Sequence, residues 1–278
     1  MKAKTVVRRA PNITCRFFML ITLLTDFGRQ DGYAGAMQGV LHQRAPGVTL
    51  VTISHEIPAQ DVAAGAYVLA QAWEHFPPGT VHLAVVDPGV GSSRRGLGVR
   101  AGGHFFVAPD NGLLSHVFAR EPEFEARALT ESEFWLPRPS RTFHGRDIFA
   151  PVAAHLANGA DFSRLGPVIA DPMRLPWPAV EPLPRGVRAR ILHTDHFGNL
   201  ILNVTARDVP GHAPQNWRAR LREFTITGLS GAYADVPEGA LLVYWGSAGY
   251  LEIAVRGGSA AARTGARRGE AVEIDFLT

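Results

Sequence analysis

Apolar residues in the first part of the chain alternate between short continuous runs and a spacing of three to four residues. Continuous runs predict buried strands, and the wider spacing predicts helices. Strands are expected at 21–25, 48–54 and 81–86, and as a hairpin at 97–100 and 104–108; helices are expected at 33–44, 61–76 and 148–158. Asp61 can cap the second helix. Strands alternating with such helices predict an α/β unit with a mixed, mainly parallel sheet covered on both faces.

A dense run of prolines interrupts this pattern between Gly166 and Pro184. Proline at this density cannot continue a helix or a central strand, so the segment is predicted to be an extended linker. Beyond it, short apolar runs separated by turn residues predict strands at 187–193, 200–204, 241–245, 250–255 and 271–276. This pattern is typical of a small all-β barrel or sandwich. The predicted organisation is an α/β domain over 19–165, a linker over 166–184 and a β-barrel domain over 185–278.

The positive charge of the chain is concentrated at its start. The sequence has 28 Lys and Arg against 25 Asp and Glu, but residues 1–18 carry five basic residues and no acidic one. The rest of the chain is slightly acidic, so the net charge of +3 does not indicate a nucleic-acid or membrane partner, and neither is expected. Met19 directly precedes the first predicted strand. Residues 1–18 are therefore expected to be a disordered extension or the product of an over-called start.

Lysine and cysteine are almost absent, which excludes several chemistries. The only lysines are Lys2 and Lys4, so the folded body has no lysine for a Schiff base or a phosphate-binding loop. Cys15 is the only cysteine, which excludes an intrachain disulfide and cysteine-rich zinc sites. The histidines lack the spacing of a helical metal site, and no metal is expected. With no cleavage motif after the apolar run at 17–24, the predicted location is cytoplasmic.

Polar residues follow three of the predicted strands at their carboxyl ends. Asp26 follows the first strand, Ser54 and His55 follow the second, and Asp87 follows the third. Ligands in such sheets bind outside the carboxyl ends of the strands, so these residues are candidates for a site. The alternative is that each one is only a helix cap or a turn residue. Three in succession at one edge favour a site.

The segment from Asp87 to Arg95 carries the most information. A carboxylate enters this proline- and glycine-rich turn, and the Arg94 guanidinium leaves it seven residues later. Further along, His144 is expected in a loop before a helix, from which it can reach a site. The structural alternatives are a loop salt bridge between Asp87 and Arg94, and a loop histidine that bonds the backbone.

Six short motifs occur in one order along the chain. They are Thr25-Asp26-Phe27-Gly28, Val86–Gly91 with Arg94-Arg95, Pro109-Asp110-Asn111-Gly112, Phe143–Asp147, Phe197-Gly198-Asn199 and Gly249–Ala254. Together they resemble the S-adenosyl-L-methionine (SAM) hydroxide adenosyltransferases, the hydrolase relatives of the fluorinases and chlorinases. The resemblance covers residues 19–278. It implies an N-terminal α/β domain joined by a linker to a C-terminal β-barrel.

The resemblance also implies a catalytic triad and an oligomer. The family's Asp–Arg–His triad carries over onto Asp87, Arg94 and His144. The implied assembly is a homotrimer that holds SAM between the N-terminal domain of one subunit and the C-terminal domain of a neighbour. SAM is the substrate in this family, and no separate cofactor is implied.

Substrate-binding positions follow from the same motifs. Asp26 is expected to hold the ribose hydroxyls, Asn199 with Phe197 to hold nucleoside and methionine parts, and the hairpin from Ser247 to Glu252 to lie against the methionine end. The remaining implied substrate-binding residues are Phe27, Asn111, Asp195 and Tyr233, the last of which would stack on adenine.

The implied reaction converts SAM and water into adenosine and L-methionine by attack of water or hydroxide on the ribose C5′. Two alternatives remain at this point. A halogenase of the same superfamily would use a halide as nucleophile, but the charged set of Asp87, Arg94 and His144 would crowd a halide pocket. A protein that binds SAM or adenosine without catalysis is the other alternative.

Overall fold

The computed structural model describes residues 19–209, 211 and 216–277. The prediction for residues 1–18 therefore lies outside the described part of the chain. The chain divides into two compact units between Arg174 and Leu175.

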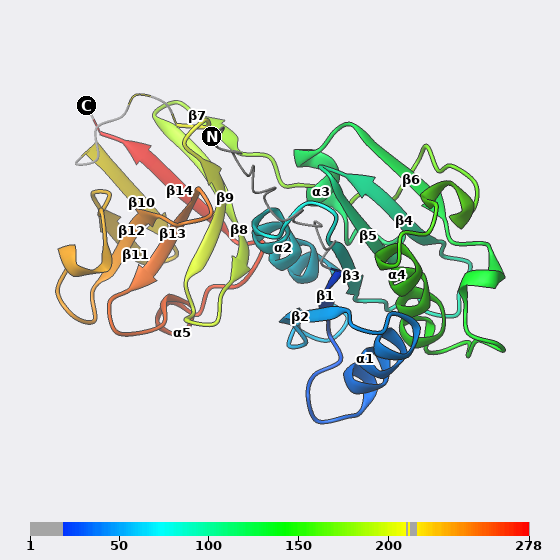
Figure 1. Cartoon of the computed structure of the whole chain (residues 1–278). Coiled ribbons are helices and arrows are strands. Elements are labelled where there is room, and N and C mark those ends of the chain that lie inside the picture. The colour runs from blue at the N-terminus through cyan, green and yellow to red at the C-terminus, as the bar shows by residue number, and fades with distance from the viewer. Residues whose placement is uncertain (1–18, 210, 212–215, 278) are drawn as a thin grey trace, which may run out of the picture. The chain divides into compact units, whose positions relative to one another are not determined.

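A six-stranded sheet forms the centre of the N-terminal unit, with the strand order β2-β1-β3-β5-β4-β6 (Figure 1). The strands are β1 (Leu20–Thr25), β2 (Thr49–Ser54), β3 (Val81–Val85), β4 (Gly96–Ala101), β5 (His104–Pro109) and β6 (Phe124–Ala128). Strands β2, β1, β3 and β5 pair in parallel, whereas β4 is antiparallel to both β5 and β6. The expected mixed, mainly parallel sheet is confirmed, and β6 is an additional strand that the apolar pattern did not indicate.

Helices lie on both faces of this sheet, as expected. They are α1 (Tyr33–Arg44), α2 (Val62–Ala72), α3 (Ser115–Arg120) and α4 (Ala150–Ala157), with 3₁₀ turns at Trp73–His75, Ser132–Phe134 and Phe162–Leu165. Helix α1 packs on α4, and α2 packs on α3. Asp61 caps α2 as predicted, because its Oδ1 accepts a hydrogen bond of 2.9 Å from the Ala64 amide.

The predicted start of the last of these helices was wrong. A π-helical turn over Gly145–Phe149 precedes α4, and His144 is the N-cap residue of that turn with helical backbone angles. His144 is therefore fixed at the start of a helical segment rather than carried by the preceding loop. This rigid placement matters because His144 belongs to the candidate site.

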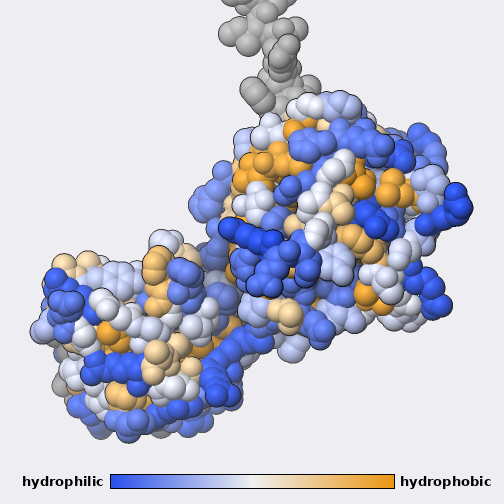
Figure 2. Space-filling model, turned by 90° about the horizontal axis from the view of Figure 1, so that it is seen from below, coloured by the Kyte–Doolittle hydropathy of each residue, from blue (hydrophilic) through white to orange (hydrophobic). Residues whose placement is uncertain are grey.

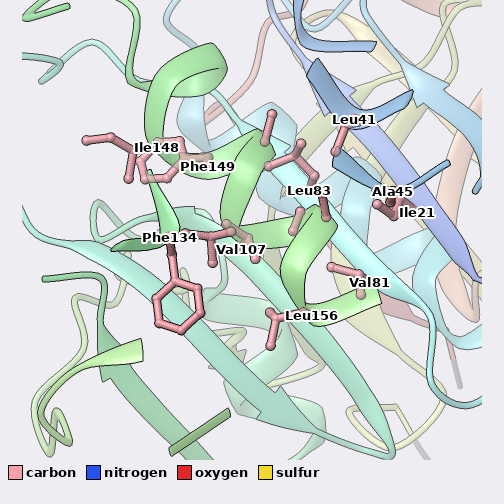
Figure 3. Close-up of a cluster of buried hydrophobic side chains, with 14 of the residues drawn as sticks. Ile21, Leu41, Ala45, Val81, Leu83, Val107, Phe134, Ile148, Phe149 and Leu156 are labelled. Atoms are coloured by element: carbon pink, nitrogen blue, oxygen red, sulfur yellow. The ribbon is translucent and has the colours of Figure 1, made fainter. Parts of the chain in front are cut away.

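The face of the sheet beneath α1 and α4 holds the main core of this unit (Figure 3). Ile21, Leu83 and Val107 project from neighbouring strands, and Leu41 and Phe149 meet them from the helical side. All five are fully buried. Burial of side chains of this size stabilises the fold by about 1.5–3 kcal/mol each, so the sheet edge that carries the site rests on a rigid support.

Antiparallel strands make up most of the C-terminal unit, which forms a nearly closed barrel (Figure 1). The strands are β7 (Glu181–Leu183), β8 (Gly186–Thr194), β9 (Leu200–Thr205), β10 (Trp217–Leu221), β11 (Phe224–Thr227), β12 (Leu241–Trp245), β13 (Tyr250–Val255) and β14 (Ala271–Phe276). They follow the order β11-β10-β14-β8-β9-β13-β12, with β7 paired to β8. The predicted barrel fold is confirmed, although the unit also contains the short helix α5 (Ala260–Thr264) and a 3₁₀ turn at Tyr233–Asp235.

Three strands of this unit were not predicted. Strand β10 has arginines and β11 has threonines at alternate positions, so neither shows the continuous apolar run by which the other strands of this unit were predicted, and β7 lies inside the predicted linker. Pro182 sits in β7 as an outer strand paired on one side to β8. An outer strand tolerates proline because one of its edges needs no N–H donors, whereas a central strand does not.

The surface in Figure 2 is largely hydrophilic, with small hydrophobic areas between charged and polar residues. Within the described residues no helix is long and apolar enough to span a bilayer. In the same part of the chain, no group of three or more His, Cys, Asp and Glu side chains could hold a metal ion. The large apolar side chains that are exposed are Tyr33, Val168, Met173, Trp177, Phe197 and Tyr233.

Candidate active site

Strand register brings two of the candidate carboxylates to one edge of the N-terminal sheet. Strands β1 and β3 are parallel neighbours, and Thr25 pairs with Val85 at their carboxyl ends. Asp26 follows the first of these residues, and Asp87 follows the second by two positions. The sequence predicted this meeting, because the ends of parallel strands lie at a common edge.

A cleft of about 620 Å³ opens at this edge. Four of the candidate residues contribute to its lining: Asp26, Phe27, Asp87 and His144. The other lining residues are Tyr33, Ala59, Gln60, Val85, Pro88, Val90, Ser140, Thr142, Phe143, Gly145 and Arg146. A concave site of this size with a few convergent polar groups is typical of a small-molecule pocket.

Asp87, Arg94 and His144 form one hydrogen-bonded chain beside the cleft. Arg94 Nε donates to both Asp87 oxygens, at 2.8 and 3.0 Å, and Arg94 Nη2 donates to Asp87 Oδ2 as well. The same Nη2 lies 3.0 Å from Nδ1 of His144. The Arg94 and Asp87 side chains are only 10% and 6% exposed, and the guanidinium packs over the Phe149 ring at 5.0 Å. The ion pair is thus desolvated and fixed in orientation, which strengthens its field in the cleft.

The contact with Arg94 determines which nitrogen of His144 carries the proton. A guanidinium has donors only, so Nδ1 of His144 must accept the hydrogen bond. The neutral ring therefore holds its proton on Nε2. Burial and the nearby Arg94 charge lower the pKa of His144 below its usual 6.5, against weaker opposing effects of Asp87 and Asp147. His144 is accordingly neutral at pH 7.

A close backbone contact holds the loop after β3 in place. Gly91 has φ +77°, and a side-chain carbon on it would lie 2.5 Å from the carbonyl oxygen of Arg141. Only glycine fits this approach. Ser92 closes the turn by bonding the Gly89 carbonyl at 2.7 Å. The Asp87 loop and the segment that leads to His144 are therefore packed against each other.

Three aromatic rings form one wall of the cleft, and the sequence indicated only Phe27 among them. Tyr33 and Phe143 have ring centroids 5.3 Å apart, and both contact Phe27 at 6.0 and 5.8 Å. Arg146 stacks over the ring of Phe143 at 4.9 Å and is held by Asp147. Tyr33 could not be recognised from the sequence, because its position at the start of α1 also suits an ordinary helix residue.

Asp26 is held by the backbone of a distant turn. The amide of Gln60 donates to Asp26 Oδ2 at 2.7 Å, and Gln60 has the left-handed backbone angle φ +65°. Nothing in the sequence indicated Gln60. Asp26 and Gln60 are adjacent polar residues of the cleft lining.

The side chains of two other candidates at this edge bond neighbouring residues at the strand ends. His55 is 5% exposed, and its Nδ1 bonds Thr25 Oγ1 at 2.8 Å. Asn111 donates through Nδ2 to the Val86 carbonyl at 2.8 Å, and its Oδ1 accepts from the Leu113 amide. Neither is among the lining residues of the cleft. Asn111 instead holds the strand end from which Asp87 projects.

The candidates of the C-terminal unit form a separate chain of hydrogen bonds. Asn199 Nδ2 donates to Asp195 Oδ2 at 2.8 Å and to Tyr233 Oη at 3.0 Å. Tyr233 and Tyr244 hydroxyls lie 2.7 Å apart, and the Tyr244 hydroxyl donates to Glu252. Nothing in the sequence marks Tyr244 as a member of this group, because Tyr244 lies inside an apolar strand. Since the Tyr244 proton goes to Glu252, Tyr233 donates to Tyr244, and every proton of the chain has a defined acceptor.

The side chains of this hydrogen-bonded series differ in burial. Asn199 and Glu252 are 3% and 8% exposed, and burial raises the pKa of Glu252 above its usual value. Gly246 leaves the space that Glu252 fills, because a side-chain carbon there would lie 1.8 Å from its Oε1. Phe197, by contrast, is 72% exposed, and Ser247 is exposed in the turn between β12 and β13. The unit thus presents an aromatic side chain beside a rigid, buried amide.

Comparison with known proteins assigns both units to one family. The N-terminal model of the SAM hydroxide adenosyltransferases matches residues 21–166, and the C-terminal model matches residues 189–273. The chain is 41% identical over 244 residues to a protein of Salinispora arenicola named (R)-S-adenosyl-L-methionine hydrolase, covering 87% of this chain and 92% of that protein. A fluorinase of an Actinoplanes species is 27% identical over 84% of this chain and 90% of its own length. The crystal structure of an uncharacterized conserved protein from Thermotoga maritima has a TM-score of 0.85 and 36% identity, covering 91% of this chain and 99% of that one.

Proposed function

The chain belongs to the SAM hydroxide adenosyltransferase family, and on that premise we propose that it hydrolyses SAM to adenosine and L-methionine. The observation that carries the proposal is the hydrogen-bonded chain of Asp87, Arg94 and His144 beside a cleft that also contains Asp26. The hydrolase relatives are 36–41% identical to this chain, whereas the fluorinases are 26–27% identical. These hydrolases are named for the R epimer of SAM, and we propose that epimer as the substrate.

The chemistry needs activation of the nucleophile and no acid for the leaving group. The water oxygen forms a bond to C5′ of the ribose while the bond from C5′ to sulfur breaks. Its electron pair passes to sulfur, so that the positively charged sulfonium leaves as a neutral thioether, and the water gives up one proton. Bulk water is a very weak acid, so the enzyme must accept that proton and stabilise the hydroxide character of the oxygen.

Asp87 and His144 divide this task. Nδ1 of His144 accepts from Arg94, so the neutral ring offers Nε2–H as a donor to the water oxygen. The carboxylate of Asp87 has only acceptors and receives the proton. Arg94 is always charged, so it orients both partners and stabilises negative charge as it develops on the oxygen.

The remaining parts of SAM need groups from both units. Asp26 is proposed to accept hydrogen bonds from the ribose hydroxyls, and Phe27 to contact the nucleoside. In the C-terminal unit, Asn199, Phe197 and Tyr233 are proposed to bind adenine. Asp195 and Glu252 hold the hydrogen-bonded side chains of this group in place. Asn111 acts by fixing the end of β3. Ser247 is proposed to contact the methionine end.

We propose that a neighbouring subunit supplies the C-terminal unit of each site, in a homotrimer. Exposed Tyr33 in the cleft and exposed Phe197 and Tyr233 in the other unit support this arrangement, because they are large apolar side chains that a neighbour would cover. A cytoplasmic location stays a prediction from the sequence, based on the single cysteine and on the missing cleavage motif after residues 17–24.

The function is tested by incubating the purified protein with each sulfonium epimer of SAM and separating the products. Adenosine and methionine from the R epimer support the proposal. A 5′-halo-adenosine formed in the presence of chloride or fluoride would make the protein a halogenase. Binding of SAM without any product, by folded protein, would make it a non-catalytic binding protein.

Shared sites are tested by co-expressing two inactive variants, Asp87→Asn and Asn199→Ala. If each site combines residues of two subunits, mixed oligomers contain some sites with neither change, and activity returns to a measurable fraction of the wild-type value. Sedimentation of the wild-type protein at the mass of three chains is the companion measurement. A monomer with full activity would exclude the shared site.

A further inference from the structure

Gln60 adopts a backbone conformation that glycine would adopt more easily. It lies in a tight turn in which the Asp61 amide bonds the Pro58 carbonyl at 3.0 Å, and its φ is +65°. Apart from glycine, residues in this region are strained, and such strain persists where the surroundings impose it. Asp61 already caps α2, so the cap does not require the Gln60 side chain. A side chain at this position therefore calls for another explanation.

The turn also places Gln60 against Asp26. The Gln60 amide donates to Asp26 Oδ2 at 2.7 Å, and both residues line the cleft. Among the described residues, no side chain or backbone group bonds the carboxamide of Gln60 or the second oxygen of Asp26. These two groups are adjacent, polar and available to the same part of a ligand.

From this arrangement we propose that Gln60 is a specificity-determining residue, whose carboxamide gives one of the ribose hydroxyls a second hydrogen bond beside the Asp26 carboxylate. A carboxamide suits a hydroxyl because it offers a donor and an acceptor, and both hydroxyls of the ribose need a partner when water leaves the cleft. The backbone amide of Gln60 meanwhile fixes the Asp26 carboxylate. The inference rests on the proposed function, since it assumes that the cleft binds a nucleoside.

The main test compares SAM with its 2′-deoxy and 3′-deoxy analogues in the wild-type protein and in Gln60→Met. Methionine keeps the length of the side chain and the backbone strain but removes the carboxamide. We expect kcat/KM for SAM to fall about 3- to 10-fold, the effect of one neutral hydrogen bond. For the analogue that lacks the contacted hydroxyl, the loss should disappear. An equal loss on all three substrates would overturn the inference.

A second variant, Gln60→Gly, separates binding from structure. It relieves the left-handed strain, so the melting temperature should hold or rise by a few degrees while the ribose preference falls as in Gln60→Met. The matched control is Arg138→Gly, since Arg138 has φ +59°, is exposed and does not line the cleft. The control should show the same thermal behaviour with unchanged ribose preference. A Gln60→Gly protein that melts lower and keeps its ribose preference would show a purely structural side chain.

Failure of this inference can be distinguished from failure of the proposed function. Wild-type protein that forms no adenosine from SAM contradicts the function itself. In that case the same preference can be measured as binding of adenosine against 2′-deoxyadenosine and 3′-deoxyadenosine by calorimetry. Wild-type protein that cleaves SAM while Gln60→Met keeps the full preference for ribose contradicts only the inference.

Discussion

Two polar clusters in the N-terminal unit use the same strand and the same kind of residue, and they differ in access to solvent. His82 lies within β3, where its Nδ1 bonds Thr22 Oγ1 at 2.7 Å and its Nε2 lies 3.2 Å from His104 Nδ1. His144 bonds Arg94 beside the cleft, and Asp87 lies there two residues beyond the end of β3. Burial lowers the pKa of both His82 and His144.

Access decides what each cluster can do. His82 and His104 are 0% and 4% exposed, and neither lines the cleft. The Trp73 ring packs edge-on against both. A sealed cluster can only stabilise or destabilise the fold, whereas a cluster with a buried ion pair at a cleft can act on a ligand. A perturbed histidine is therefore not by itself a sign of catalysis.

The largest expected effect is on the cluster beside the cleft. In Asp87→Asn the proposed proton acceptor is lost, and kcat for SAM hydrolysis should fall about 10²–10⁴-fold while KM changes less than threefold. Steady-state assays measure both. The matched control is Asp110→Asn, because Asp110 pairs with Arg95 in a neighbouring ion pair that does not line the cleft. That control should lose stability and keep kcat within a few fold; equal losses of kcat would mean that the two ion pairs act alike.

The sealed cluster should show the reverse behaviour. In His82→Leu, Thr22 and His104 lose a buried partner, so the free energy of unfolding should fall by about 1–3 kcal/mol with unchanged kcat. Urea denaturation measures the first quantity. His42→Leu, an exposed histidine of α1, is the control and should change stability by less than about 0.5 kcal/mol. Loss of kcat in His82→Leu would break the contrast between the clusters.

Acid should lower the free energy of unfolding through the sealed cluster. Burial lowers the pKa of His82 to about 3 from 6.5, so the unfolded chain binds a proton below pH 6.5 that the folded chain excludes. Stability is then complete above pH 6.5 and declines by about 1.4 kcal/mol per pH unit as the pH falls toward 3. Urea denaturation at several pH values should give a shallower slope in His82→Leu. An identical slope would assign the acid sensitivity to other groups.

The smallest expected effect concerns the chain in the C-terminal unit. Tyr244→Phe removes the link between Tyr233 and Glu252, so KM for SAM should rise about 3- to 10-fold with kcat within twofold. Glu252→Gln should raise KM less, because its carboxamide oxygen still accepts a hydrogen bond from Tyr244. If neither variant changes KM, these hydrogen bonds resemble those of the sealed cluster and only stabilise the barrel.

Much of the fold could be predicted, because its signals are local. The apolar pattern gave α1 and strands β12, β13 and β14 at their observed bounds, and Asp61 was recognised as a cap. It missed β6, β10 and β11, where polar or charged residues alternate with apolar ones and no continuous apolar run marks the strand. The start of the helix after His144 was misplaced because a π-helical turn has no simple period in the sequence.

The sequence by itself determined the chemistry available to this protein: a body without lysine or cysteine, with carboxylates after β1 and β3 and an arginine seven residues beyond Asp87. Tertiary structure alone decided the proton position on His144, the partners of His82 and the contact of Gln60 with Asp26. The reason is physical. Residue types and strand ends are local properties, but hydrogen-bond direction and burial depend on groups that lie dozens of residues away.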